Sequence, residues 1–263
     1  MTDDLLVRRD GAVVSIAFNR PKRFNALTLE VVESATAAVE AADADPTVRL
    51  ITLTGTGSAF CSGADLADGI DPADYPEGEP VPVGLVDAVN RFTLAMRAAS
   101  LLVVALVNGV AAGVGSSFVL GADLAVASDA ARLKTAFAGI GLMPDGGGTA
   151  YLAAALGRSR ALAVAILDDE IDAAEALRTG LVARMWPADD FDAESAAFVD
   201  RLASGPTAAY AAIKRGIDAC LLADLPEALE RERRDQRALL GSRDFASAVA
   251  AFRTREQVMF TGA

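Results

Sequence analysis

Two glycine-rich segments of this chain could together supply backbone hydrogen-bond donors to one ligand. The first runs Ala59-Phe60-Cys61-Ser62-Gly63-Ala64-Asp65-Leu66, and the second runs Asn108-Gly109-Val110-Ala111-Ala112-Gly113-Val114-Gly115. Each follows an apolar, strand-like run, at 49–54 and 101–107, so each can direct a free N–H into a shared pocket. Two such donors form an oxyanion hole, which stabilises negative charge on a carbonyl oxygen. Taken singly, each segment also fits a close-packed turn between a strand and a helix.

The residue types exclude several other chemistries. The chain has no histidine, which removes Ser-His-Asp and Cys-His arrangements, histidine bases and histidine-based zinc sites. Cys61 and Cys220 lie far apart in the sequence, so we expect neither a zinc site nor a disulfide framework, as in a reducing compartment. The second glycine segment lacks the third glycine of the dinucleotide fingerprint, and no Gly-Lys-Ser/Thr phosphate loop occurs. We therefore expect no bound metal.

The elements that must position these segments alternate between strand-like and helix-like runs. Strands are predicted at 12–18, 50–54, 102–107, 124–127 and 181–185, and the first helix at 28–42, with Thr28 as its N-cap. This alternation predicts an α/β body over 1–190. Helices alone are predicted after that, at 192–202, 207–222, 226–240 and 244–255, which gives a helical C-terminal region over 191–263. Late apolar helices commonly cover a core or a partner subunit, so we expect this region to form an oligomer and to cover the active site.

Composition narrows the setting further. The 263 residues are 52% hydrophobic and carry a net charge of −12, which predicts a globular protein and disfavours binding to nucleic acid or an anionic membrane. The uncharged run at 101–122 is divided by glycines into a strand, a loop and a helix, so we do not expect it to span a membrane. The acidic N-terminus shows no signal peptide, and we expect a cytoplasmic protein. The acidic, proline-rich segment at 65–82 predicts either a mobile flap or a solvated surface loop.

Four ordered motifs, at 19–27, 59–66, 108–115 and 139–149, resemble the enoyl-CoA hydratase/isomerase, or crotonase, family across nearly the whole chain. The Pro144-Asp145-Gly146-Gly147-Gly148-Thr149 segment and the Phe260-Thr261-Gly262 ending are most similar to the 1,2-epoxyphenylacetyl-CoA isomerase-like members. The resemblance implies a spiral of ββα units with a helical C-terminal region, assembled as a homotrimer or a dimer of trimers. It also implies an acyl-CoA thioester substrate and no separate cofactor, because CoA is part of the substrate.

The resemblance implies a role for particular residues as well. The N–H groups of Ala64 and Val114 would hold the oxygen of a thioester enolate, and Asp145 would act as acid and base. The two glutamates of the family's hydratases fall at Ser117 and Phe137 here, which favours double-bond isomerisation over hydration. Hydration with non-standard water activation, and acyl-CoA binding without catalysis, remain alternatives. The non-catalytic alternative for Asp145 is that it caps a helix beginning near Gly146.

The remaining expectations concern ligand contacts. Residues implied to bind CoA are Lys22, Arg23, Asn25, Ala26, Leu27, Ser62, Asp65, Leu66, Phe252 and Arg255, and those implied to line the acyl pocket are Phe137, Ser117 and Leu142. Each of the cations could equally be a solvated surface charge. Burial against Phe137 and Leu142 would raise the pKa of Asp145. We expect Cys61 to be a small packing residue, and the alternating charges at 230–235 to form one ion-paired helix face.

Overall fold

The computed structural model describes residues 2–66, 81–254 and 256–262. A six-stranded sheet has the order β1-β2-β3-β5-β7-β10 and is parallel except for the β1–β2 hairpin. Its strands are β1 (Leu5–Asp10), β2 (Val13–Phe18), β3 (Leu50–Gly55), β5 (Leu102–Val107), β7 (Leu124–Ser128) and β10 (Arg184–Trp186). The strands predicted at 12–18, 50–54, 102–107 and 124–127 correspond to β2, β3, β5 and β7.

A second sheet of very short strands accompanies the first, in the order β4-β6-β8-β9. It consists of β4 (Ala59–Cys61), β6 (Val110–Ala112), β8 (Arg132–Lys134) and β9 (Ile171–Asp172). Three times the chain passes from the large sheet to the small one and then into a helix. These helices are α2 (Gly84–Ala98), α3 (Val114–Gly121) and α4 (Gly148–Leu167). The repeated unit is ββα, so the predicted crotonase-type spiral is confirmed.

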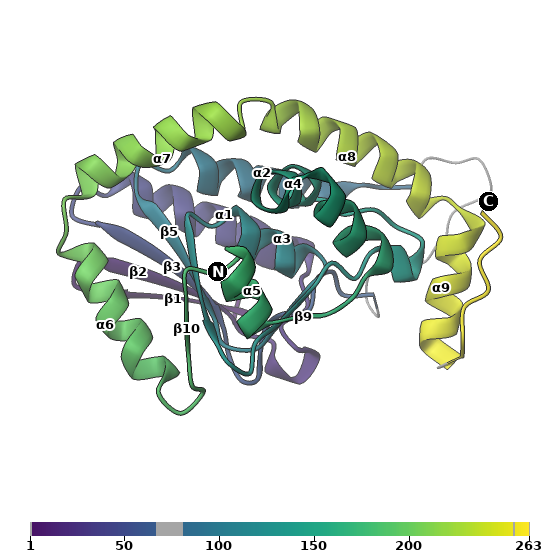
Figure 1. Cartoon of the computed structure of the whole chain (residues 1–263), viewed down its shortest axis with the longest axis horizontal. Coiled ribbons are helices and arrows are strands. Elements are labelled where there is room, and N and C mark those ends of the chain that lie inside the picture. The colour runs from purple at the N-terminus through teal and green to yellow at the C-terminus, as the bar shows by residue number, and fades with distance from the viewer. Residues whose placement is uncertain (1, 67–80, 255, 263) are drawn as a thin grey trace.

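The other helices enclose this spiral (Figure 1). Helix α1 (Leu29–Ala44) begins after Thr28, whose hydroxyl accepts a hydrogen bond from the N–H of Val31, as the N-cap prediction requires. Helix α5 (Ala173–Thr179) precedes β10, and the C-terminal region contains α6 (Phe191–Ala203), α7 (Thr207–Leu221), α8 (Leu225–Leu240) and α9 (Arg243–Thr254). In Figure 1, α7 and α8 follow one another along one edge of the molecule, and α9 turns away at the far end.

The predicted strand at 181–185 is wrong at its start, because β10 begins only at Arg184. Leu181 and Val182 instead close the end of α5, and the N–H of each donates to the carbonyl of Ala176. Both side chains are buried in the main core. The first residues of this apolar run therefore end α5 and pack in the core, and only its last residues belong to a strand.

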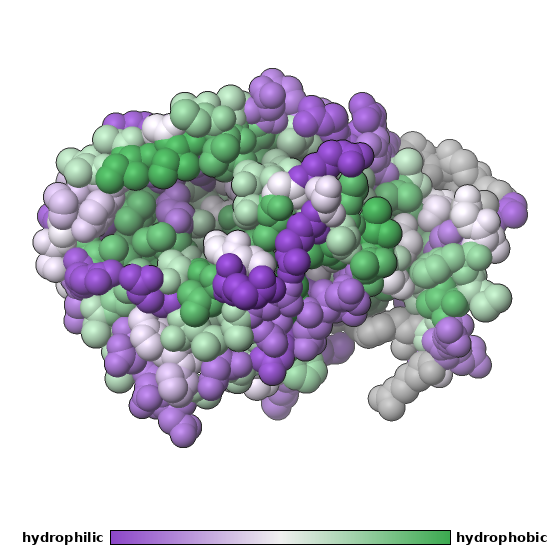
Figure 2. All heavy atoms as spheres, in the orientation of Figure 1, coloured by the Kyte–Doolittle hydropathy of each residue, from purple (hydrophilic) through white to green (hydrophobic). Residues whose placement is uncertain are grey.

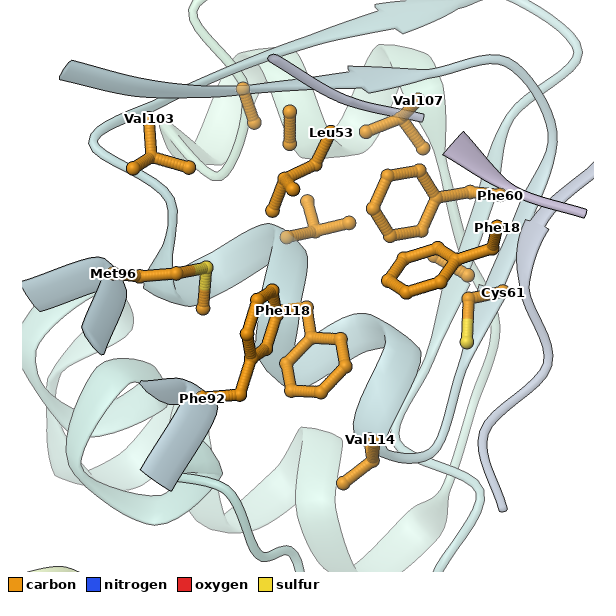
Figure 3. Close-up of a cluster of buried hydrophobic side chains, with 14 of the residues drawn as sticks. Phe18, Leu53, Phe60, Cys61, Phe92, Met96, Val103, Val107, Val114 and Phe118 are labelled. Atoms are coloured by element: carbon orange, nitrogen blue, oxygen red, sulfur yellow. The ribbon is translucent and has the colours of Figure 1, made fainter. Parts of the chain in front are cut away.

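A cluster of phenylalanines packs beneath α3 (Figure 3). Phe92 from α2 and Phe118 from α3 meet edge to face, with ring centroids 4.7 Å apart, and Phe18 stacks on Phe118 at 6.2 Å. All three are essentially without solvent exposure. Aromatic contacts of this geometry add to the stability gained from burial alone. The cluster fixes the direction of α3, and therefore the position of Val114 at its first turn.

The uncharged run at 101–122 forms β5, β6 and α3, as the glycine pattern predicted. Within the described residues one helix, α4, has the length and composition of a membrane span. Gly157 interrupts it with φ 69° and ψ 161°, which are not helical values. The break divides α4 into two helices, each well short of the roughly 20 residues that cross a bilayer.

Candidate active site

The two glycine-rich segments lie against each other at the ends of β4 and β6. Gly63 has φ 91°, and a side-chain carbon at this position would lie 3.0 Å from the carbonyl oxygen of Ala112 and 3.4 Å from the Cα of Gly113. The same carbon would lie 3.5 Å from the nitrogen of Val114. Only glycine combines this conformation with so close an approach. The sequence expectation that both segments face one pocket is therefore met by the backbone itself.

Ala64 presents a free backbone donor because of the way its neighbours pair. The N–H of Leu27 donates to the carbonyl of Gly63 at 2.8 Å, and the N–H of Asp65 donates to the carbonyl of Leu27 at 3.0 Å. This bridge uses the residues on either side of Ala64 and leaves the Ala64 N–H unpaired. Among the residues that the structure describes, that N–H has no protein acceptor.

Val114 supplies the second free donor. It is the first residue of α3, and Gly113, with φ 55°, precedes it as the N-cap. First-turn N–H groups have no acceptor within a helix, and the helix dipole adds partial positive charge at the same place. Ala64 and Val114 both line one cavity, together with Asp145. This arrangement can hold the oxygen of a thioester as it becomes negatively charged.

Two asparagines secure the strand that leads to Ala64. The side-chain amide of Asn25 donates to the carbonyls of Thr56 and Ala59 at 2.9 and 2.7 Å, and its oxygen accepts from the N–H of Arg20. Asn108 donates to the Ala59 carbonyl from the other side, at 3.3 Å. Asn25 is almost fully buried. The protein backbone thus occupies this side-chain amide, and the expected contact of Asn25 with CoA stays a prediction.

Asp145 lies in the wall of the cavity with 5% of its surface exposed. Its Oδ2 accepts a hydrogen bond from Nε2 of Gln236 at 2.9 Å, whereas its buried Oδ1 has no partner within the described residues. Burial raises the pKa of Asp145 to about 7; the Gln236 donor opposes this rise, and the negative charge of Glu232 adds to it. The prediction of a raised pKa is confirmed, and the value suits a proton carrier near neutral pH.

The alternative role of Asp145 as a helix cap is wrong. Helix α4 begins at Gly148, and its first free N–H groups are bound by Glu232 of α8. The Glu232 carboxylate accepts from the N–H of Gly147 at 2.8 Å and from the N–H of Thr149 at 2.9 Å, as well as from the Thr149 hydroxyl. Asp145 makes no such contact with its side chain.

Glu232 also corrects the expectation of an ion-paired face at 230–235. It is only 1% exposed, although Arg233 does pair with Asp87 and Arg234 with Asp235. A signal for this was present in the sequence. The buried residues of α8 recur at helical spacing, and the polar members fall on the same stripe as the apolar ones: Leu225, Ala228, Leu229, Glu232, Gln236 and Leu240.

Apolar side chains make up most of the remaining cavity wall. Phe137 and Leu142 line it as predicted. Ser117 does not; its hydroxyl lies behind the wall and donates to the carbonyl of Asp145 at 2.7 Å. Sequence reasoning missed the contribution of α2, which provides Leu85, Val86 and Val89. The C-terminal region, which was expected to cover the site, provides Leu240 and Phe245. The C-terminal region thus closes over the cavity of its own chain.

The family model for enoyl-CoA hydratase/isomerase matches residues 8–263. The chain belongs to this family. It is 40% identical to a probable enoyl-CoA hydratase of Rhodobacter capsulatus over 94% of this chain and 93% of the relative. It is also 33% identical to the 1,2-epoxyphenylacetyl-CoA isomerase of Escherichia coli over the full length of both. An enoyl-CoA hydratase structure from Mycobacterium avium subsp. paratuberculosis superimposes with a TM-score of 0.90, at 40% identity, covering 99% of this chain and all of that one.

The residues expected to bind CoA in this enoyl-CoA hydratase/isomerase family member fall into three groups. Leu27, Ser62, Asp65 and Leu66 line the cavity. Lys22 and Arg23 are exposed on the short 3-10 helix η1 (Pro21–Arg23), and Ala26 is buried beside it. Phe252 lies in α9, but its side chain and the whole of Arg255 lie outside the described residues, as does most of the segment predicted to be a flap or loop at 65–82.

Asp65 is the other carboxylate among the described residues that line the cavity. Its Oδ2 lies 2.8 Å from Nη1 of Arg20, and both side chains are largely buried. This ion pair engages the Asp65 carboxylate. Asp145, in contrast, has a buried carboxylate oxygen, Oδ1, without a partner among the described residues.

Proposed function

We propose that this family member is an enoyl-CoA isomerase that moves a carbon–carbon double bond through a thioester enolate, with Asp145 as the proton carrier. One observation carries the proposal. Among the described residues that line the cavity, Asp145 alone combines a carboxylate oxygen without a partner with a position beside the free N–H groups of Ala64 and Val114. The proposed substrate class is an acyl-CoA thioester, and the proposed location of the protein is the cytoplasm. No separate cofactor takes part in the proposed reaction.

The proposed reaction begins with a 3-enoyl-CoA. The Asp145 carboxylate removes a proton from C2, and the electron pair of the broken C–H bond delocalises onto the thioester oxygen. The N–H groups of Ala64 and Val114 stabilise this dienolate; one such donor is typically worth about 10² to 10³ in rate. The protonated Asp145 then returns the proton to C4, and the double bond is left between C2 and C3. One carboxyl group therefore completes the cycle with no net gain or loss of protons.

Hydration makes a larger demand, because one group must activate water while another protonates the adjacent carbon. At the two positions where the family's hydratases carry glutamates, Ser117 holds the backbone of Asp145 and Phe137 is an apolar part of the wall. The name of the 40% identical Rhodobacter relative nevertheless supports hydration as the second candidate. It would require water activation by a group other than this glutamate pair.

The test offers the purified protein a 3-enoyl-CoA and a 2-enoyl-CoA, and repeats both with Asp145→Asn. We expect formation of the conjugated 2-enoyl product from the first, followed by its ultraviolet absorbance, and loss of at least a hundredfold in kcat in the variant. Rapid formation of 3-hydroxyacyl-CoA from the second would favour the hydratase instead. Binding of both thioesters without turnover would identify a non-catalytic acyl-CoA binder.

We also propose that the protein assembles as a homotrimer or a dimer of trimers. Support comes from large apolar side chains left exposed on two helices, and Figure 2 shows hydrophobic residues gathered along α7. The exposed residues are Leu162, Ile166 and Leu167 on α4, and Ile213, Ile217 and Leu221 on α7. Contiguous exposed apolar surface commonly marks a protein interface. Light scattering of the purified protein distinguishes a monomer from either assembly.

A further inference from the structure

Helix α8 carries two buried polar side chains that reach the start of α4. Glu232 and Gln236 lie one helical turn apart and are 1% and 2% exposed. Burial of a polar group in an otherwise apolar stripe is unfavourable unless the group is hydrogen-bonded. Both are fully engaged here, and the partners of both belong to the segment that holds Asp145.

The orientation of the Gln236 amide is fixed by its surroundings. Its Oε1 accepts a hydrogen bond from the backbone N–H of Met143 at 3.2 Å. A backbone N–H can only donate, so the oxygen of the amide must face Met143 and its NH₂ group must face Asp145. Oδ2 of Asp145 is therefore held as an acceptor, which leaves Oδ1 as the oxygen that can take up and release a proton.

Glu232 fixes the other side of the same segment. Its carboxylate binds the N–H groups of Gly147 and Thr149, where α4 has no cap from its own sequence. An anion at this position compensates the positive end of the α4 dipole. The Asp145 carbonyl in turn accepts the N–H of Gly148 at 3.1 Å. The backbone of Asp145 is thus anchored through a loop that α8 holds in place.

We propose that Gln236 and Glu232 are a positioning pair for Asp145: Gln236 reserves Oδ2 so that Oδ1 carries the transferred proton, and Glu232 holds the loop from which Asp145 lines the cavity. The inference deepens the proposed isomerase function and rests on it for its catalytic meaning. Neither residue lies within the two glycine-rich segments, so the C-terminal region would determine which atom of the active site does the chemistry.

The two residues have opposite electrostatic effects on Asp145. The Gln236 donor favours the carboxylate and lowers the pKa of Asp145, whereas the Glu232 charge disfavours it and raises that pKa. The other charged groups that face this site are Asp65 across the cavity, already paired with Arg20, and Arg231 beside Glu232. Substitution at 236 removes neither charge interaction, whereas Glu232→Gln removes the one between Glu232 and Arg231 and leaves the Asp65–Arg20 pair in place.

The experiment compares Gln236→Leu and Glu232→Gln with the matched control Glu230→Gln. Glu230 lies on the same helix, but its side chain is 71% exposed. We expect the acidic limb of the kcat–pH profile to move upward by about one pH unit in Gln236→Leu, since a hydrogen bond to a charged group is lost. It should move downward in Glu232→Gln and stay in place in the control. The plateau kcat of Gln236→Leu should fall about tenfold while KM changes less than about threefold.

A second readout does not depend on turnover. Carbon-13 NMR of protein labelled at the aspartate carboxyl carbon gives the titration of Asp145 directly, with its signal assigned by its loss in Asp145→Asn. Opposite shifts in the two variants support the positioning pair, and shifts of one sign or none overturn it. If the two variants show opposite shifts but the wild-type protein does not isomerise 3-enoyl-CoA, the positioning pair is supported and the proposed function is refuted. If Gln236→Leu does not fold, Gln236→Asn, too short to span Met143 and Asp145, is expected to behave alike.

Discussion

Replacing the charge of Asp145 should stabilise the protein while it removes activity. Asp145→Asn keeps the size of the side chain, and its oxygen can still accept the hydrogen bond from Gln236. What the substitution removes is the need to bury a negative charge. A carboxylate held in an apolar cavity wall lowers the free energy of unfolding, and it lowers it further as the group ionises.

The size of the effect comes from the pKa of Asp145, which burial raises from an ordinary 3.8 to about 7. Below pH 3.8 the group is neutral in both the folded and the unfolded protein. Between these values the unfolded chain releases its proton and the folded one keeps it, so the stability that the protonated group contributes is lost as pH rises. Each pKa unit corresponds to about 1.4 kcal/mol, so the full loss is at most about 4 kcal/mol.

Urea unfolding at fixed protein concentration measures this between pH 5 and pH 9. The free energy of unfolding of Asp145→Asn should exceed that of the wild type by a margin that grows from pH 5 to pH 7 and is constant above pH 8. Asp235→Asn is the matched control, because Asp235 is exposed and its hydrogen bond to Arg234 lowers its pKa. If the difference in free energy of unfolding does not depend on pH, or if Asp145→Asn is less stable than the wild type, burial does not raise the pKa of Asp145 as described.

Three further predictions test the backbone and the thiols. Val114→Pro removes one N–H donor at a helix position that tolerates proline, so kcat should fall about 10² to 10³-fold. The control Val114→Gly keeps the donor and should keep most of the activity. Equal kcat values in the two variants would exclude the donor role. Asn25→Ala deletes the three hydrogen bonds of a buried side chain, two of them to the carbonyls of Thr56 and Ala59, and should cost about 3 kcal/mol in urea unfolding. A cost below about 1 kcal/mol would contradict the structure. Burial raises the pKa of the Cys61 thiol to about 12. A thiol reagent at pH 8 should therefore modify only the exposed Cys220 until the protein is unfolded. Two fast-reacting thiols in the native protein would contradict this.

The sequence predicted β2, β3, β5 and β7 of the large sheet, missed β1, misplaced the start of β10, and predicted none of the small sheet. The strands β3 and β5 each contain five or more consecutive apolar or β-branched residues, and β2 is apolar at every position except Ser15, which is a clear local signal. The strands β4, β6 and β8 have three residues each, too few for any periodicity. They form because the neighbouring ββα units stack, which is a property of the whole spiral and of no single segment.

The active site divides in the same manner. Ala64, Val114 and Asp145 could be proposed from the sequence because each lies in a compact motif; Leu142 lies in the same motif as Asp145, and Phe137 shortly precedes it. Glu232 and Gln236 lie about ninety residues beyond Asp145, in a helix whose alternating charges dominate its appearance in the sequence. The helical stripe that they share with Leu225, Leu229 and Leu240 indicates burial, but their partners depend on how α8 docks and are known only from the tertiary structure.

The convergence of Asn25 and Asn108 on the Ala59 carbonyl bears on how the protein acquires activity. These hydrogen bonds join residues 34 and 49 positions apart, and the strands they bring together pair in parallel. Non-local contacts of this kind are among the last to form during folding, because the intervening chain must first be closed into loops. The two N–H donors are spaced for catalysis only once all three segments have met. Intermediates with most helices formed should therefore be catalytically silent, and regain of turnover marks the final step of folding.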